Sequence, residues 1–126
     1  MKNIIALEYQ EGINLMQWAL YHPIAKNHLI HIPNEGKRSW KEGKKKKQEG
    51  IKSGVSDYFL AYPSNNKHGL WIELKRRSKQ AKLTENQAIW LVRMEKSGYA
   101  TKVAYGWEEA KKFILEYLYP LNDEDK

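Results

Sequence analysis

Apolar residues recur along the chain with two spacings, one typical of helices and one typical of strands. Apolar residues in steps of three and four predict helices. Segments in which apolar and polar residues alternate, and which are bounded by turn formers, predict strands. The predicted helices cover residues 4–20, 84–97 and 107–119, and the predicted strands cover residues 28–33, 55–62, 70–75 and 99–105. The turn formers of residues 63–69 predict that the second and third strands pair as a hairpin. Because no repeat or linker interrupts this order, we expect one α/β domain over residues 1–126.

Two of the predicted helices carry a polar side chain on the face that is otherwise apolar. In the first helix Glu8 shares a face with Leu15 and Ala19, although an unpaired buried carboxylate is strongly disfavoured. In the second, Gln87 lies on the inward face three residues after the predicted N-cap, Thr84. Both have a structural explanation: a carboxylate near a helix N-terminus is favoured by the helix dipole, and Thr84 with Gln87 matches a capping box.

The composition excludes several classes of protein. With 41% hydrophobic and 29% charged residues, the chain of 126 residues has enough apolar side chains for a core. It contains no cysteine, which excludes disulfides, thiol nucleophiles and Cys-based zinc sites. No apolar run approaches the roughly 18 residues of a membrane helix, and Glu8 falls where a signal peptide would still be apolar. We therefore expect a soluble protein that is not secreted.

Positive charge is concentrated in one segment of the chain. The formal net charge of +7 favours a polyanionic partner such as nucleic acid. Residues 36–52 are rich in Lys and Arg and include a tryptophan, which indicates either a loop that binds a DNA backbone or a solvated loop. The residues expected to contact DNA are Lys37, Arg38, Lys44, Lys45, Lys46 and Lys47.

Three charged residues of the predicted hairpin form a candidate metal site. Glu73 and Lys75 are two residues apart on one strand, so the pleat directs both side chains to the same face. Such a pair is also common on the solvated face of a half-exposed strand. Asp57, near the start of the preceding strand, is expected to lie beside Glu73 in a twisted hairpin. Two converging carboxylates repel each other unless a cation lies between them, and oxygen ligands favour Mg²⁺ or Mn²⁺.

The lysine of this set suggests what such a site would do. The ammonium group of Lys75 is suited to orient an attacking water or to stabilise the negative charge that develops on a phosphate. With Asp57 and Glu73 as metal ligands, the three residues suit phosphodiester hydrolysis.

Several sequence motifs, taken in order, resemble one nuclease family. They are E-Y-Q-E-G-I-N-L-M-Q-W-A and I-P-N-E-G-K-R near the N-terminus, then E-G-I-K-S-G-V-S-D-Y-F-L, G-L-W-I-E-L-K, L-T-E-N-Q-A-I-W-L and G-Y-A-T-K-V-A-Y-G-W-E-E-A. Together they cover nearly the whole chain and resemble the VRR-NUC (virus-type replication-repair nuclease) domain of the PD-(D/E)xK, restriction-endonuclease-like superfamily. The resemblance implies a mixed central sheet flanked by helices.

The resemblance also implies roles for individual residues. It implies that the metal is bound by Asp57, Glu73 and the backbone carbonyl of Leu74, and that Lys75 is the catalytic lysine. It further implies a place near the metal for Gln87 and for an acidic residue of the first helix, where Glu8 fits the family pattern better than Glu11.

The chain departs from the family pattern at two positions. Ser56 replaces the proline usual before the aspartate, and Gly12 replaces the glutamine usual four residues after Glu8. Neither change removes a ligand, and Ser56 is expected to alter only how rigidly the strand begins. Gly12 removes a landmark of the register in the first helix, so the choice between Glu8 and Glu11 stays open.

The function is expected from the same resemblance. Single-domain members of the family, from phages and bacteria, look like homodimeric DNA-repair enzymes that cut branched DNA such as four-way (Holliday) junctions. We therefore expect a Mg²⁺-dependent, structure-selective DNA endonuclease that also works with Mn²⁺, forms a homodimer, and is cytoplasmic in a bacterial or phage-infected cell. The alternatives are a nuclease for flap, nicked or single-stranded DNA, and a non-catalytic DNA-binding module of the same fold.

Overall fold

Four strands of the described residues form one mixed sheet. A computed structural model describes residues 4–33, 48–78 and 81–121, the first four of them by their backbone alone. Within these residues the strand order is β1-β2-β3-β4. β1 (Leu29–His31), β2 (Tyr58–Leu60) and β3 (Leu70–Lys75) pair antiparallel, whereas β4 (Ala100–Tyr105) runs parallel to β3. The described helices are α1 (Ile4–Ala19), α2 (Ala25–His28), α4 (Glu85–Lys96) and α5 (Trp107–Leu118).

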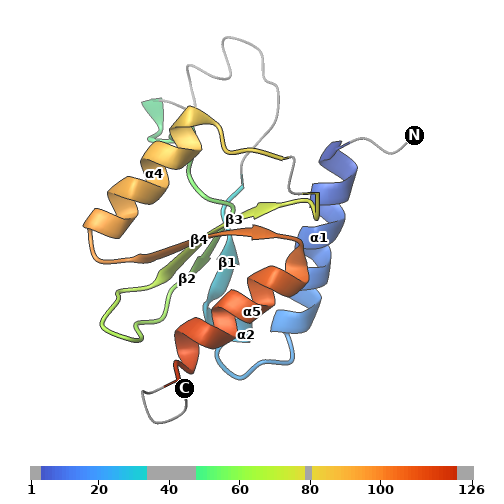
Figure 1. Cartoon of the computed structure of the whole chain (residues 1–126), viewed down its shortest axis with the longest axis vertical. Coiled ribbons are helices and arrows are strands. Elements are labelled where there is room, and N and C mark those ends of the chain that lie inside the picture. Colours follow the sequence, from blue (N-terminus) through green and yellow to red (C-terminus); the bar gives the residue numbers. More distant parts are fainter. Residues whose placement is uncertain (1–3, 34–47, 79–80, 122–126) are drawn as a thin grey trace.

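The helices cover both faces of the sheet (Figure 1). α1 and α5 pack against each other and against one face, where Leu15, Ile72 and Ile114 are fully buried. α4 packs against β3 and β4 on the other face, where Trp71 of β3 meets Trp90 edge-on at 5.2 Å between ring centroids. No helix in the described part of the chain is long and apolar enough to span a membrane.

The predicted mixed sheet and flanking helices are confirmed, with differences at the ends of elements. The strand predicted over residues 55–62 is shorter and covers only Tyr58–Leu60. The helix α2 was not predicted, because four residues are too few for a periodic pattern. It begins where the His22 side chain accepts hydrogen bonds from the backbone amides of Ile24 and Ala25, at 3.2 and 3.1 Å.

The turn before β2 packs against the beginning of α4. Gly54 has a φ of +88°, and a Cβ there would lie 2.5 Å from the backbone of Asn86. The side-chain amide of Asn86 donates a hydrogen bond to Ser53 Oγ at 3.1 Å. Glycine alone suits both this conformation and this close approach. The contact fixes the start of β2 relative to the first turn of α4, and these two segments carry Asp57 and Gln87.

Candidate active site

Asp57 lies where the pairing between β2 and β3 stops. The last pair joins Tyr58 to Ile72, and β3 continues for three more residues. The Asp57 carboxylate takes the place of the next strand residue, because its Oδ2 accepts a hydrogen bond from the Leu74 amide at 2.8 Å. In an extended strand the amide and carbonyl of one residue point to the same side. The Leu74 carbonyl therefore faces the same side of β3 as Asp57.

Glu73 is almost completely buried, with 2% of its surface exposed. Its Oε2 accepts a hydrogen bond from Gln87 Nε2 at 3.3 Å and lies 3.9 Å from Lys75 Nζ. Its Oε1 is buried and has no hydrogen-bond partner among the described residues. A buried carboxylate oxygen without a donor is a position that a cation or an ordered water would satisfy.

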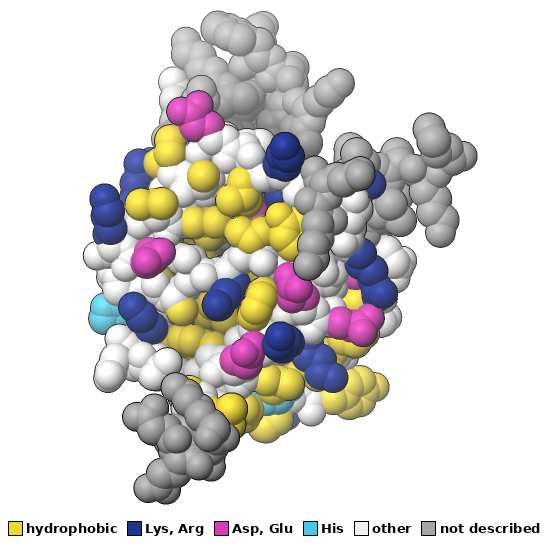
Figure 2. Space-filling model, viewed as in Figure 1, with side chains coloured by type: hydrophobic (Ala, Val, Ile, Leu, Met, Phe, Trp, Pro, Cys, Tyr) yellow, Lys and Arg dark blue, Asp and Glu magenta, His cyan; other side chains and the backbone are white. Residues whose placement is uncertain are grey.

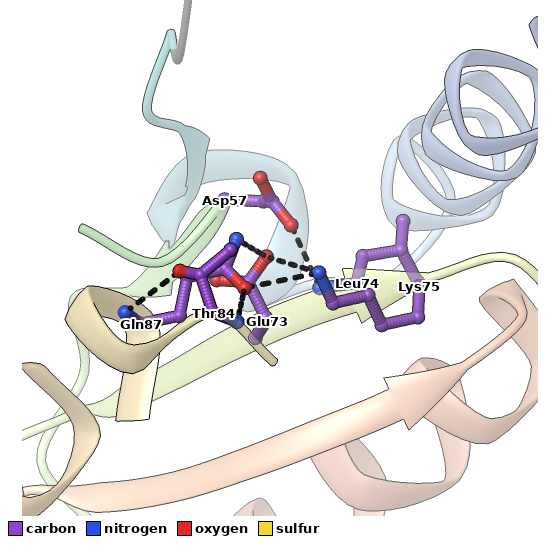
Figure 3. Close-up of polar contacts among 6 residues, drawn as sticks. All are labelled: Asp57, Glu73, Leu74, Lys75, Thr84 and Gln87. Carbon is purple, nitrogen blue, oxygen red and sulfur yellow. Dashed lines mark hydrogen bonds and ion pairs between the residues drawn. The ribbon is translucent and has the colours of Figure 1, made fainter. Parts of the chain in front are cut away.

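Gln87 joins the lysine to the carboxylate (Figure 3). Its side-chain Oε1 accepts hydrogen bonds from Lys75 Nζ at 3.1 Å and from the Thr84 amide at 2.9 Å. The backbone amide of Gln87 donates a hydrogen bond to Thr84 Oγ1 at 3.2 Å, which completes the predicted capping box. Gln87 can therefore cap α4 and also belong to the candidate site. Its side-chain oxygen has two lone pairs, and its NH₂ group remains free to reach Glu73.

The surroundings of Glu73 raise the pKa of its carboxyl group. Burial is the largest of the causes that raise the pKa of Glu73 to about 9. Asp57 raises it further, by its charge and by a hydrogen bond that forms only when Glu73 is protonated, Lys75 lowers it, and Glu8 adds to the increase. When both carboxyl groups are ionised they face each other with no proton between them. A divalent cation would replace that proton and favour the ionised form of both groups.

The two glutamates of α1 have different surroundings. Burial raises the pKa of Glu8, Lys75 lowers it and Asp57 raises it, so Glu8 faces the candidate site. Glu11 is held elsewhere: its Oε2 accepts from Arg77 Nε and its Oε1 from the Trp107 amide, each at 3.0 Å. Glu11 therefore caps the start of α5, and Glu8 is the glutamate available to the candidate site.

The donor set fits a hard divalent cation. The described residues contain no group of three or more His, Asp or Glu side chains arranged around one point. Asp57 and Glu73 would thus supply two carboxylate oxygens, and the Leu74 carbonyl a third ligand. Mg²⁺ is commonly held by one or two carboxylates together with water and substrate phosphate oxygens, so the small number of protein ligands agrees with this ion.

Comparison with known proteins identifies the family. The model of the VRR-NUC domain matches residues 5–108. The chain belongs to the VRR-NUC family. VRR-NUC domains are nuclease-type domains, which agrees with the residues gathered at the end of β3. A solved structure named "VRR_NUC domain protein" is 24% identical, with a TM-score of 0.76 over 87% of this chain and 86% of that chain, and it shows the shared fold. The comparison with curated proteins found no match.

Some residues near the site were not expected from the sequence, and others lie outside the described residues. Arg76 directly follows Lys75. Its charge lowers the pKa of Glu8, and its buried Nε has no partner among the described residues. Only its position directly after Lys75 could have indicated it. The expected DNA contacts all lie outside the described residues: Lys37, Arg38, Lys44, Lys45, Lys46 and Lys47.

Proposed function

We propose that this VRR-NUC domain is a Mg²⁺-dependent endonuclease that hydrolyses phosphodiester bonds in branched DNA such as four-way junctions. The observation that carries the proposal is the convergence of Asp57, Glu73 and Lys75 at one end of the sheet, with Glu73 Oε1 buried and unpartnered among the described residues. A domain that only binds DNA has no need to bury a carboxylate and an ammonium group, since burying charges costs free energy.

Each residue of the site has a chemical task. Asp57 and Glu73 would hold the cation, and Gln87 fixes the Glu73 carboxylate by its Nε2 donor. A bound Mg²⁺ would polarise the phosphate and lower the pKa of a bound water. The Lys75 ammonium group, held by Gln87 Oε1, would orient the attacking water or stabilise the negative charge that develops on the phosphate.

The distribution of charge supports a polyanionic substrate. On the face shown in Figure 2, Lys and Arg side chains lie among Asp and Glu side chains over α5 instead of forming a patch of one sign. By contrast, residues 34–47 contain seven Lys or Arg and only two Glu. We propose that this segment contacts the DNA backbone. Affinity should then fall by about 0.9 log unit per neutralised phosphate for each log unit of salt.

A homodimer follows from the proposed substrate. Symmetric cutting of a four-way junction needs two active sites, and the described residues of each chain form one candidate site. We propose that the enzyme acts as a homodimer on branched DNA during DNA repair, in the cytoplasm of a bacterial or phage-infected cell.

A panel of synthetic substrates tests the proposal. Four-way junctions, flaps, nicked duplexes, intact duplexes and single strands of matched sequence are incubated with Mg²⁺, Mn²⁺ or EDTA. We expect cleavage of the junction with either ion and none in EDTA. Preferred cleavage of flaps, nicks or single strands would redirect the substrate assignment, and binding without cleavage of any substrate would indicate a DNA-binding module.

A further inference from the structure

A groove of about 550 Å³ runs along α1 beside the candidate active site. One wall includes Ile13 and Met16, together with Tyr9, which is 71% exposed. The opposite wall carries two aromatic rings in contact, His31 of β1 and Tyr58 of β2, with centroids 4.9 Å apart. The volume lies within the range of roughly 300–1,000 Å³ that is common for small-molecule pockets.

The groove is continuous with the candidate active site. Glu8, Asp57 and Leu74 all line it, and Asp57 with the Leu74 carbonyl is expected to hold the metal. A phosphodiester bound there would place its neighbouring nucleotide at the groove. A second protein chain in the groove would cover Asp57 and block the site, which argues against a protein as the occupant.

We propose that this groove binds an unpaired nucleobase of the DNA next to the scissile phosphate, a role that rests on the nuclease function proposed above. Bases bind proteins by stacking on aromatic and apolar side chains, and Tyr9 presents an exposed ring while Ile13 and Met16 supply an apolar wall. The ring nitrogens of His31, which is exposed, offer hydrogen bonds to the base edges. The groove thus combines a stacking surface with a few polar groups.

Gly12 makes room for the hydroxyl of Tyr58. A Cβ at residue 12 would overlap the Tyr58 hydroxyl oxygen, so a larger residue would displace the ring from the groove. The buried Tyr58 ring is thereby held between α1 and His31, where it supports the floor of the groove.

An unpaired base in this groove accounts for selectivity towards DNA structure. A base within a duplex must leave its stack and its partner before it can enter a pocket, and this cost is smallest for bases that are already mismatched or single-stranded. Gaps and flaps supply such bases, and the base pairs at a branch point are easier to open than those within an intact duplex. The groove would thus favour cleavage beside a branch without reading the sequence.

Substitution of Tyr9 tests the proposal by cleavage. The substrate is a branched DNA that the wild type cuts, prepared with a normal base or an abasic residue on either side of the mapped cut. For the wild type we expect the abasic form to raise KM about tenfold, in keeping with the loss of one stacked base. Tyr9→Ala should show almost no difference in KM between the normal and the abasic substrate. Val92→Ala, at a 51% exposed apolar position of α4, is the matched control.

A binding measurement separates this proposal from the nuclease function. The base analogue 2-aminopurine, placed at the same position, should be quenched by the wild type in EDTA and not by Tyr9→Ala. Quenching without cleavage of any DNA would refute the nuclease function and support the groove. If the wild type cleaved the normal and the abasic substrate with the same KM and did not quench 2-aminopurine, only the base-binding role of the groove would be refuted. If Tyr9→Ala cleaved the normal and the abasic substrate equally poorly and its dimer dissociated in sedimentation experiments, the groove would be the contact with a second copy of the chain. That result would overturn the proposal.

Discussion

Replacing Glu73 by glutamine should stabilise the metal-free protein, and the gain should grow with pH. A glutamate in the unfolded chain has a pKa of about 4.3, whereas burial beside Asp57 raises the pKa of Glu73 in the folded protein. Between these two values the folded state binds one proton more than the unfolded state. The stabilisation from this group is therefore complete below the unfolded pKa and is lost as pH rises towards the folded pKa.

The size of the effect follows from this linkage. The wild type should lose about 1.4 kcal/mol of folding free energy per pH unit through this group, whereas the glutamine side chain introduced by Glu73→Gln does not titrate. From pH 6 to pH 8 the variant should gain about 2.7 kcal/mol relative to the wild type. For a domain of this size that corresponds to roughly 10 °C in Tm.

Calorimetry in EDTA at pH 6, 7 and 8 and constant ionic strength measures this difference in Tm. Glu116→Gln, at an exposed position of α5, controls for the loss of one charge. Mg²⁺ should raise the Tm of the wild type more at pH 8 than at pH 6, because binding needs the ionised carboxylate, and it should not raise the Tm of Glu73→Gln. A difference in Tm that stays the same at all three pH values would refute the reasoning.

Three other predictions concern the supports of the site. Thr84→Ala should cost about 1 kcal/mol of stability through the lost cap and lower kcat, whereas Thr84→Ser should restore both; equal kcat in the two variants would contradict a link between the capping box and Lys75. Gly54→Ala should lower Tm more than Gly50→Ala, because both have positive φ but only residue 54 has a neighbour within 4 Å; equal losses would show that the packing against α4 is unimportant. Glu8→Gln should reduce cleavage with little change in Tm. Glu11→Gln should instead lower the free energy of unfolding by about 1–3 kcal/mol, which is the cost of leaving a buried hydrogen-bonding group unpaired. The opposite pattern would show that the two glutamates have each other's role.

The convergence of Asp57, Glu73 and Lys75 was predictable because it depends on short-range features. The two-residue period of a strand places Glu73 beside Lys75, and the turn formers of residues 63–69 bring the preceding strand alongside. The structure agrees, with Lys75 Nζ 3.9 Å from Glu73 Oε2 and Asp57 bonded to the β3 backbone.

The choice between Glu8 and Glu11 could not be made from the sequence. Residues three apart lie on the same side of a helix, so periodicity does not separate them. What separates them is distant in sequence: Glu11 reaches Arg77 and the amide of Trp107. The shared role of Gln87 was unpredictable for a similar reason, because its contact with Lys75 depends on how α4 packs against β3.

The most direct test of the central claim compares the wild type with Asp57→Asn on a four-way junction. The asparagine oxygen can still accept the hydrogen bond of the Leu74 amide, so the fold should be kept while a metal ligand loses its charge. We expect Mg²⁺-dependent cleavage by the wild type, no cleavage by the variant, and nearly equal junction binding by both proteins in EDTA. Cleavage by Asp57→Asn at the wild-type rate would contradict the assignment of this site.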